Sequence, residues 1–312
     1  MRTLLLLFLL ITTQLSFSQD YKSVDSIVKN YPKAFKSIEK FAKKIESDFT
    51  TDIEKTRAAY YWISNNVSYD YKSANSVRSS GYHYYDDSEL KKVQLEYAEN
   101  VLKEKKSVCE GYSQLLKYVL EQLEVKCEVI DGYAKTEVKE IGKIKNEENH
   151  AWNAVYLNEK WQLIDATWST GNEENNPGYF NFNDAYFLIR PEYLIWSHFP
   201  DDKKWQLIKK PISNLAFFYS PIFHSGFYNS GLELTKMKGI IKSNRTIQLS
   251  FDSIDTDKIY YYQYTESSYN LEPIEFIKKG NKQIAEIPYS YKNGKELTIF
   301  NGFKACLSFK II

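Results

Sequence analysis

Cysteine is scarce in this sequence. It occurs only at positions 109, 127 and 306, whereas small exported proteins held by disulfide bonds carry several closely spaced pairs. No pair of His or Cys residues has the short spacing typical of a zinc site. We therefore expect no disulfide framework, no metal and no other cofactor. An odd number of cysteines leaves at least one thiol free unless it pairs between molecules.

Long apolar runs and an excess of charge of either sign are also missing. Beyond the N-terminal segment, no run approaches the ~20 apolar residues with which a helix crosses a bilayer. The chain has 41 basic and 40 acidic residues, a formal net charge of +1. Near-neutrality argues against nucleic acid or an anionic membrane as the main partner. We expect no membrane span and no nucleic-acid partner.

The first 18 residues have the pattern of a secretory signal peptide. Arg2 precedes the apolar run 4–11, and Ser16 and Ser18 occupy the small-residue positions before a cleavage after residue 18. We therefore expect a soluble, exported protein, periplasmic or extracellular. The abundance of Lys, Ile, Asn and Tyr looks bacterial. Cleavage leaves 294 of the 312 residues, a length that favours two domains.

Helical periodicity dominates the first part of the mature chain. Residues 19–50 predict an N-terminal helical segment, and Thr51 with Glu54 predicts a capping box for a helix over 52–65. Further helices are predicted over 93–104 and from Cys109 onward. The polar, aperiodic residues 69–88 predict a long surface loop.

Strand patterns follow, so the predicted fold class is α+β. Residues 127–133, 150–157 and 161–165 predict strands, and the charged residues 136–149 predict a mobile loop. Short strand or turn elements over 182–190 and 193–198 would close this domain, 51–210. Residues 211–312 predict a small β-sandwich-like domain, because short alternating runs are separated there by turn clusters. These runs are 232–235, 246–251, 259–264, 282–287, 297–300 and 304–311.

Cys109 is the first candidate functional residue. It directly precedes an apolar stripe with helical spacing, which places its thiol at the first turn of a helix. Unpaired backbone N–H groups and the helix dipole favour a thiolate at that place. His150 and Asp165 follow downstream. Cys, His and Asp are the residue types of a nucleophile, its base and the group that orients the base.

The hairpin between residues 150 and 165 decides whether His150 and Asp165 meet. A loop of two residues (158–159) or of four (157–160) places Trp152 opposite Asp165, and His150 then points to the same face. A three-residue loop without a bulge would put the two side chains on opposite faces. The short turn at 158–160 is compatible with the favourable register.

A mechanism follows from these placements. Cys109 would attack a carbonyl carbon, His150 would move the proton from thiol to leaving amine, and Asp165 would hold the imidazole tautomer. The backbone N–H of Cys109 is the natural oxyanion donor. Trp152 and Tyr112 are further candidates for the oxyanion site or the cleft.

Each of these residues also has an ordinary structural interpretation. A single Cys at a helix start is often buried and inert, and a lone His on a strand is often a satisfied structural group. Cys127 and Cys306 lie in apolar strands and are expected in the core. Of the other histidines, His83 and His224 are expected at the surface, and His198 in a local hydrogen bond.

Five segments resemble the transglutaminase-like superfamily and, within it, the kyphoscoliosis-type peptidase group. In chain order they are Tyr60–Ile63 with Tyr69-Asp70, Val108–Tyr112, His150–Asn153, Leu163–Trp168, and Tyr186–Leu188 with Pro191-Glu192. The tail from His198 to Leu207 is similar too. The resemblance covers about residues 50–210. It implies a papain-like core of helices packed on an antiparallel sheet, catalytic Cys109, His150 and Asp165, no metal of its own, and a β-sandwich-like region after it.

These observations favour an exported cysteine enzyme that acts on amide bonds of protein or peptide substrates, including those of the cell envelope. Hydrolysis is favoured over amine transfer because water is always present. Members of this superfamily include transferases, peptidases, amidases and inactive proteins. The alternative is therefore a non-catalytic binding or scaffold protein on the same fold. A peptidoglycan peptide amidase is a third hypothesis, which rests on the expected compartment alone.

Overall fold

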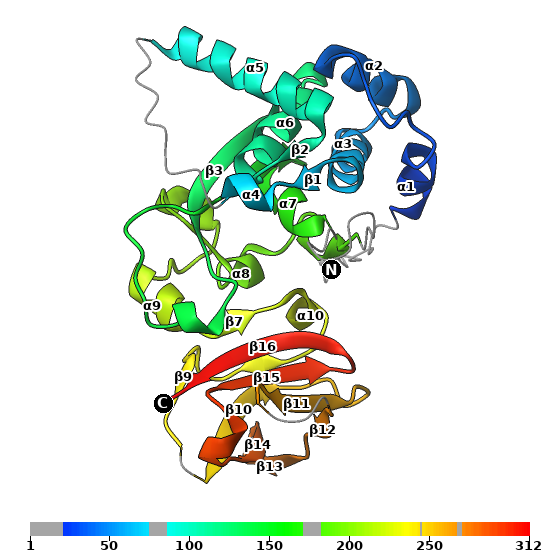
Figure 1. Cartoon of the computed structure of the whole chain (residues 1–312). Helices are drawn as coiled ribbons and strands as arrows, with labels where there is room; N and C mark the ends of the chain where they lie inside the picture. Colours follow the sequence, from blue (N-terminus) through cyan, green and yellow to red (C-terminus); the bar gives the residue numbers. More distant parts are fainter. Residues whose placement is uncertain (1–20, 75–85, 171–181, 244, 267–269) are drawn as a thin grey trace, which may run out of the picture.

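The structure is a computed structural model that describes residues 21–74, 86–170, 182–243, 245–266 and 270–312. The expected signal peptide, residues 1–18, lies outside the described residues, as does His83. Figure 1 shows two parts, with helices around one sheet in the first part and stacked strands in the C-terminal part. A helix-and-sheet core with added C-terminal antiparallel strands agrees with the predicted fold class.

Helices α1 (Lys22–Val28), α2 (Ile38–Asp48) and α3 (Asp52–Asn66) open the chain. The predicted capping box is present, because Thr51 accepts from the Glu54 backbone N–H and Glu54 reaches back to the N–H of Thr51. The apolar faces of these helices share one hydrophobic core with the helix that starts at Cys109. The N-terminal helical segment thus packs as part of the core around the candidate site.

The predicted loop over 69–88 is shorter in the structure than expected. Strand β1 (Ser68–Tyr69) and helix α4 (Tyr71–Ala74) occupy its start, and residues 75–85 lie outside the described residues. Helix α5 (Asp87–Glu104) begins at Asp87 rather than at residue 93. The reason is an N-cap, since the Asp86 carboxylate accepts from the backbone N–H groups of Ser88 and Glu89.

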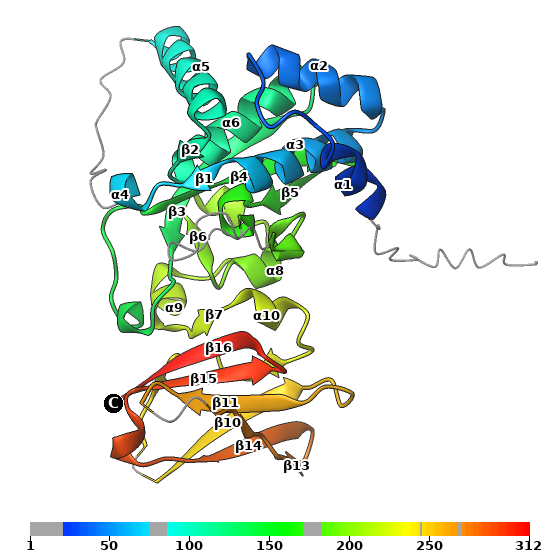
Figure 2. The same ribbon diagram turned by 45° about the vertical axis from the view of Figure 1, so that its right-hand side comes forward.

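Four antiparallel strands form the sheet of the first part, in the order β5-β4-β3-β6. They are β3 (Cys127–Ala134), β4 (His150–Leu157), β5 (Lys160–Ile164) and β6 (His198–Pro200). Helix α6 (Cys109–Gln122), which follows the two-residue strand β2 (Lys106–Ser107), packs against β3 and β4. Figure 2 shows α6 beside these strands. The strand that carries His150 therefore lies next to the helix that starts at Cys109.

The β4–β5 hairpin has the two-residue loop and the register that the sequence predicted. Asn153 pairs with Ile164, and Leu157 pairs with Lys160. Both loop residues, Asn158 and Glu159, have positive φ angles, 51° and 62°, as a type I′ turn requires. One detail differs from the prediction: β5 ends at Ile164, and Asp165 is the N-cap of the next helix.

The expected mobile loop over 136–149 is anchored at its start. It contains a 3-10 turn at Val138–Glu140, and Val138 and Ile141 are buried against Ile222. Lys135, just before it, is buried and donates hydrogen bonds to the carbonyl oxygens of Phe217 and Ser220. The sequence did not predict this anchoring, because the apolar residues among the charges contact a residue far along the chain.

Short elements connect the two parts. They are α7 (Ala166–Ser169), a 3-10 turn at Asp184–Tyr186, α8 (Pro191–Leu194), a 3-10 turn at Lys203–Gln206, α9 (Asn214–Tyr219), β7 (Ile222–Phe223) and α10 (Ser225–Tyr228). Most of the region 182–198 is thus helical turn, although Ile189 makes a bridge to Leu163.

The C-terminal part is a pair of packed sheets, as predicted. One has the order β13-β14-β10-β8, and the other β12-β11-β15-β16-β7, with β9 parallel to β16. The pattern of alternating exposed and buried residues in β10 fits a strand with one face on a core. The strands are β8 (Glu233–Leu234), β9 (Ile240–Ile241), β10 (Thr246–Ser253), β11 (Tyr260–Tyr264), β12 (Glu272–Pro273), β13 (Phe276–Lys279), β14 (Lys282–Pro288), β15 (Glu296–Asn301) and β16 (Lys304–Ile311).

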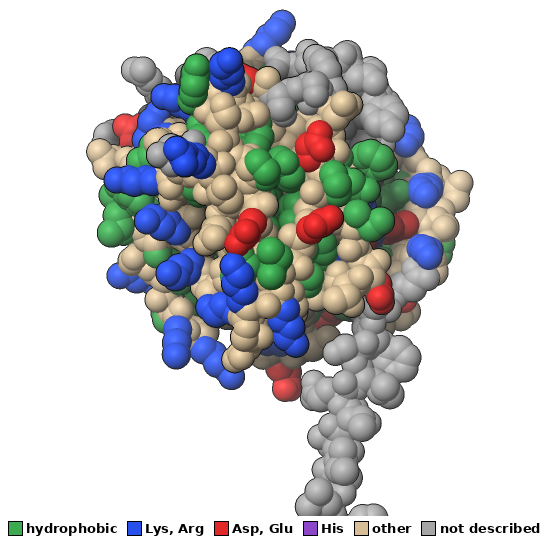
Figure 3. Space-filling model, turned by 90° about the horizontal axis from the view of Figure 1, so that it is seen from below, with side chains coloured by type: hydrophobic (Ala, Val, Ile, Leu, Met, Phe, Trp, Pro, Cys, Tyr) green, Lys and Arg blue, Asp and Glu red, His purple; other side chains and the backbone are tan. Residues whose placement is uncertain are grey.

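The near-neutral net charge conceals an uneven surface. Seen from the end of the C-terminal part, Lys and Arg side chains gather along one side, while hydrophobic and a few acidic side chains occupy the centre and the other side (Figure 3). Among the described residues, no helix is both long and apolar enough to cross a membrane.

Candidate active site

Cys109 stands at the first position of α6, where the helix has no side-chain cap. Val108 is the extended N-cap residue and makes no side-chain hydrogen bond to the first turn. Cys109 is partly exposed, whereas Cys127 and Cys306 are buried, as the sequence predicted. Burial raises the pKa of Cys127 far above its usual range and that of Cys306 to about 11. Cys109 is therefore the thiol that a reagent or substrate meets first.

The helix start is fixed by close packing around its first turn. Gly111 lies against Ser107 so closely that an added Cβ would meet the Ser107 hydroxyl oxygen at 2.0 Å. Tyr112 is fully buried, and its hydroxyl donates to the carbonyl oxygen of Val67 at 2.6 Å. This hydrogen bond ties α6 to the end of α3, and the cleft role of Tyr112 stays a prediction.

His150 and Asp165 are in direct contact. Nε2 of His150 lies 2.7 Å from Oδ2 of Asp165, and both side chains are buried. The hairpin register explains the contact, because it brings the first residue of β4 and the residue after β5 to one face. With Nε2 on Asp165, Nδ1 is the ring nitrogen left for a thiol. The Cys109 side chain lies near the ring, since it contributes to the raised pKa of His150.

Asp165 is also the N-cap of α7. Its other oxygen, Oδ1, accepts from the backbone N–H groups of Thr167 at 2.7 Å and Trp168 at 3.0 Å. The carboxylate is thus held in place by a helix N-terminus, which favours the charged form. Because Asp165 lies between β5 and α7, its carboxylate can bind His150 of the hairpin and cap the helix at the same time.

A second histidine, His198, binds the same carboxylate oxygen. Its Nε2 lies 2.9 Å from Oδ2 of Asp165, and its side chain is completely buried. His150 and His198 reach Asp165 from the two strands that flank β3, opposite Gly132 and Ala134. An added Cβ at Gly132 would lie 2.3 Å from the carbonyl oxygen of Phe199. Only glycine therefore allows β6 to come this close.

Sequence reasoning assigned His198 a local hydrogen bond and did not connect it to Asp165. The local bond exists, because Nδ1 of His198 lies 2.8 Å from the Ser197 hydroxyl oxygen. The missing information was the pairing of β6 with β3. That pairing joins residues more than sixty positions apart and leaves no local pattern.

Aromatic side chains enclose the two imidazoles. Trp152 stacks on His150 with ring centroids 5.9 Å apart, and Trp168 lies 5.6 Å from His150 and 4.3 Å from His198. The indole N–H of Trp152 is buried and makes no hydrogen bond within the described part of the chain, so Trp152 stays a candidate oxyanion donor. Tyr69 is half-buried near the thiol: burial, followed by charge on Cys109, raises the pKa of Tyr69 to about 12.

The charges of this cluster are unequal. Burial lowers the pKa of His150, but the charge and hydrogen bond of Asp165 outweigh burial and, with Cys109, raise that pKa to about 10. Burial lowers the pKa of His198 to about 4, and the positive charge of His150 acts in the same direction. The pKa of Asp165 lies well below its usual range, because both histidines outweigh the effect of burial. Near pH 7 the cluster is therefore an imidazolium, a carboxylate and a neutral imidazole.

His150, Asp165 and His198 are also residue types that bind metals, and their ligand atoms lie within 4.8 Å of one another. Both Nε2 atoms are at hydrogen-bond distance from the same oxygen, and the other oxygen accepts two backbone N–H groups. The carboxylate is fully satisfied by these donors. The arrangement is that of a hydrogen-bond network, and the absence of a metal stays a prediction.

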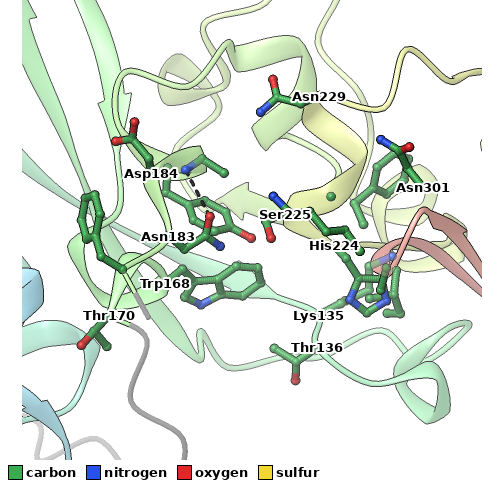
Figure 4. A pocket seen from close by; sticks show the side chains of 18 residues that line it. Lys135, Thr136, Trp168, Thr170, Asn183, Asp184, His224, Ser225, Asn229 and Asn301 are labelled. Carbon is green, nitrogen blue, oxygen red and sulfur yellow. Dashed lines mark hydrogen bonds between the residues drawn. The ribbon is translucent and has the colours of Figure 1, made fainter. Parts of the chain in front are cut away.

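A cavity of about 880 Å³ lies between the two parts of the chain. Trp168, Asn183, Asp184 and Lys135 line it from the first part, and His224, Ser225, Asn229 and Asn301 from the C-terminal part (Figure 4). The candidate triad residues do not line it. Trp168 is the connection, since its ring contacts both imidazoles and also faces this cavity.

Comparisons with known proteins agree with the resemblance in the sequence. A model of the transglutaminase-like superfamily matches residues 39–166, and thus begins within α2. The kyphoscoliosis peptidase of Mus musculus is 35% identical over 185 residues, which are 58% of this chain and 26% of that protein. The kyphoscoliosis peptidase of Homo sapiens is 36% identical over 186 residues, with the same shares of both chains.

Among solved structures, one of a TGase is similar over 55% of this chain and 38% of that chain, with 18% identity and a TM-score of 0.29. The chain spans about a quarter of the length of the two kyphoscoliosis peptidases, 26% in each case. The sequence match with the family includes the segments that carry Cys109, His150 and Asp165. Residues 39–166 therefore match the transglutaminase-like superfamily, and the chain is similar in sequence to part of the kyphoscoliosis peptidases.

Proposed function

We propose that this protein is an exported cysteine enzyme that acts on amide bonds of protein or peptide substrates, with hydrolysis favoured over amine transfer. One observation carries the proposal: the partly exposed thiol at the start of α6 lies beside a His150 that Asp165 holds protonated. Export, periplasmic or extracellular, is part of the proposal and rests on the N-terminal sequence pattern.

The chemistry follows from the proton positions. The His150 imidazolium would stabilise a Cys109 thiolate, whose Sγ attacks the amide carbonyl carbon. The carbonyl oxygen becomes an oxyanion, for which the Cys109 backbone N–H at the uncapped helix start is the nearest natural donor. His150 gives its Nδ1 proton to the leaving nitrogen as the C–N bond breaks. A thioester on Cys109 remains, and His150 then takes a proton from the water that hydrolyses it.

Asp165 supplies two effects in this sequence. It fixes which ring nitrogen faces the thiol, because its Oδ2 accepts from Nε2 of His150. Its charge also stabilises the His150 imidazolium, which later protonates the leaving nitrogen. Two backbone N–H groups hold the carboxylate itself in place, so the orientation passes from α7 through Asp165 to His150.

Thiol labelling tests the proposal without knowledge of the substrate. Iodoacetamide at pH 7 should modify Cys109 in the folded protein and leave Cys127 and Cys306 unmodified, as read by peptide mass spectrometry. The variant His150→Ala should slow that labelling by about 100-fold, since the thiolate loses its imidazolium partner. Equal labelling of the three cysteines in folded protein, or labelling unaffected by His150→Ala, would contradict a catalytic thiol.

The cavity between the two parts favours a second candidate, a binding protein that uses the same fold. The cavity has polar and aromatic walls from both parts of the chain and contains none of the triad residues. For this candidate, Cys109→Ala would leave ligand binding unchanged, and an envelope extract would leave no acyl adduct on Cys109. An acyl adduct found by mass spectrometry would support the enzyme instead.

A further inference from the structure

His198 has no part in the proton transfers of the proposed reaction. Its side chain is nevertheless completely buried, and its Nε2 is 2.9 Å from the oxygen that orients His150. A buried histidine loses its hydration, so each ring nitrogen needs a hydrogen-bond partner. Both partners are present, Asp165 on Nε2 and Ser197 on Nδ1.

The position of the His198 ring proton determines the direction of each hydrogen bond in this series. Burial and the positive His150 lower the pKa of His198 to about 4, so His198 is neutral near pH 7. Nε2 faces a carboxylate, which only accepts, so Nε2 carries the hydrogen and Nδ1 is the acceptor. The Ser197 hydroxyl also lies 3.1 Å from the carbonyl oxygen of Leu194, but Nδ1 carries no hydrogen and needs a donor, so Ser197 donates to Nδ1 over 2.8 Å. Having donated its only hydrogen, Ser197 is left as an acceptor for the next group.

That group is the hydroxyl of Tyr228, 3.0 Å from the Ser197 oxygen. Since Ser197 donates to His198, Tyr228 donates to Ser197. Burial raises the pKa of Tyr228 to about 12, so the phenol keeps its proton at all physiological pH values. The result is a directed chain from Tyr228 through Ser197 and His198 to Asp165, which we call the Tyr228 relay.

Tyr228 comes from the C-terminal side of the molecule. It ends α10, and the preceding residue, Phe227, is buried in the core of the β-sandwich against Phe223. The Tyr228 ring packs in the other direction, edge-on to Tyr186 and parallel to Tyr193. Figure 1 shows α10 between β16 and the first part of the chain. Phe227 thus belongs to the sandwich core, and Tyr228 packs both against that core and against the cluster that contains Trp152 and Tyr186.

We propose that His198 and Tyr228 are positioning residues of the active site, and that the C-terminal part thereby helps to hold the Asp165–His150 pair in its working geometry. The physical basis is the shared oxygen. Oδ2 of Asp165 stays at hydrogen-bond distance from Nε2 of His150, because the N–H group of His198 also binds this oxygen and fixes its position. His198 in turn keeps its tautomer and ring angle because Ser197 and Tyr228 hold Nδ1.

Nitrogen-15 NMR of histidine-labelled full-length protein tests the relay directly. The chain has only four histidines, so single substitutions assign every ring. At pH 7 we expect His198 as the neutral Nε2–H tautomer and His150 with both nitrogens protonated. Tyr228→Phe should shift the Nδ1 resonance of His198, because Ser197 loses its donor. Tyr193→Phe is the matched control: its hydroxyl contacts Arg190 at 3.4 Å, outside the relay, and it should leave that resonance in place.

Reactivity of Cys109 toward iodoacetamide is the second readout, and it alone rests on the proposed function. Tyr228→Phe and Ser197→Ala should each lower the rate by about three- to ten-fold, the effect of one hydrogen bond. His198→Leu should lower it further, and His198→Gln should recover most of the rate, because the Gln amide can still donate to Asp165. Ser197→Ala replaces Tyr228→Phe as the decisive variant where the latter fails to fold.

Three results would overturn the relay. They are an Nδ1–H tautomer of His198, equal spectra for Tyr228→Phe and Tyr193→Phe, and equal rates for His198→Leu and His198→Gln at equal thermal stability. The proposed function fails separately. If Cys109 is unreactive while the NMR response of His198 appears as expected, the relay stands as a structural link and the thiol chemistry is wrong.

Discussion

The two parts of this chain bury different kinds of residues. In the first part, buried side chains include Arg57, Lys135, His150, Asp165 and His198. In the described residues after Pro221, the buried polar side chains are Ser230 and Ser308, and the core is otherwise apolar. Buried charges are costly unless they are paired and hydrogen-bonded. Three of these buried residues, His150, Asp165 and His198, form the cluster at the candidate active site, so the proposed chemistry belongs to the first part.

The two parts also differ in the interactions that stabilise their cores. The sandwich is held mainly by apolar area and strand register. The first part needs in addition a fixed set of donors around each buried charge, such as the two backbone N–H groups and two histidines on Asp165. Four substitution experiments test this contrast, taken from the largest expected effect to the smallest.

Asp165→Asn should have the largest effect. The neutral amide cannot hold His150 protonated, so the pKa of His150 should fall from about 10 to its usual range or below. The rate of Cys109 alkylation at pH 7 should drop by about 10²- to 10⁴-fold, as for other orienting carboxylates in triads. The measurement is the iodoacetamide rate as a function of pH.

Asp255→Asn is the matched change in the C-terminal part, where Asp255 forms a surface ion pair with Lys258. Water screens exposed ion pairs, which contribute little to stability, so this variant should keep the wild-type rate and nearly the same stability. A comparable loss of rate in both variants would show that the contrast between the two parts is false.

Phe251→Ala tests whether the apolar core of the sandwich is independent. Phe251 is fully buried in β10, and its truncation should lower the free energy of unfolding by about 3–5 kcal/mol. All six Trp residues lie between positions 62 and 205, and one of them, Trp196, stacks on Phe223 of the sandwich core. Trp fluorescence therefore reports mainly the first part, and circular dichroism reports both. Because α10 enters both cores, we expect the two urea transitions to coincide and to shift together. A fluorescence transition that stays at the wild-type midpoint would show two independent parts.

The stability of both parts should fall in acid, and alkaline pH should affect the first part through His150. The folded pKa of His198 and of His224 is lowered to about 4, mainly by burial. Their contribution is present above 6.5 and is lost as the pH falls from 6.5 through 4. Both parts therefore weaken in acid. The folded pKa of His150 is raised to about 10, so its contribution is present below 6.5 and is lost as the pH rises through 10.

Urea unfolding at pH 4.5, 6.5 and 9 measures these slopes. His198→Gln and His224→Gln should each flatten the acid side, whereas His150→Gln should flatten the alkaline side. An unchanged alkaline slope in His150→Gln would remove the basis for a protonated His150 at neutral pH.

The smallest expected effects come from the hairpin turns of the two parts. The β4–β5 turn holds the non-glycine residue Glu159 at a φ of 62°, and the β13–β14 turn has Gly280 at 63°. Glu159→Gly should stabilise the protein by about 0.5–1 kcal/mol, and Gly280→Ala should destabilise it by about 1 kcal/mol. Thermal denaturation measures both, and equal signs would contradict the assignment of these turns.

Local patterns were sufficient for much of the fold and for the contact of His150 with Asp165. The capping box at Thr51 and Glu54, the helix start at Cys109 and the two-residue turn at 158–159 are each encoded within a few residues. The register of a short hairpin depends on loop length and turn type. For that reason the pairing of residues 150–157 with 160–164 was predictable from the sequence alone.

The parts that escaped prediction depend on long-range contacts. The pairing of β6 with β3, which brings His198 to Asp165, joins segments that share no local signal. The anchoring of residues 138–141 depends on Ile222, and the Tyr228 relay on a helix of four residues. The roles proposed for Cys109, His150, Asp165, Trp152 and Tyr112, the domain limits and the export of the chain stay predictions.

The adjacency of Phe227 and Tyr228 bears on how such a gene can evolve. Domains joined by a plain linker can be exchanged by recombination with little loss, because nothing functional crosses the joint. Here one side chain after the joint completes the sandwich core, and the next reaches the candidate active site through Ser197. A recombination event near residue 211 that replaced the C-terminal module would delete the end of that chain. We therefore expect lineages that keep this architecture to inherit the two parts as one unit.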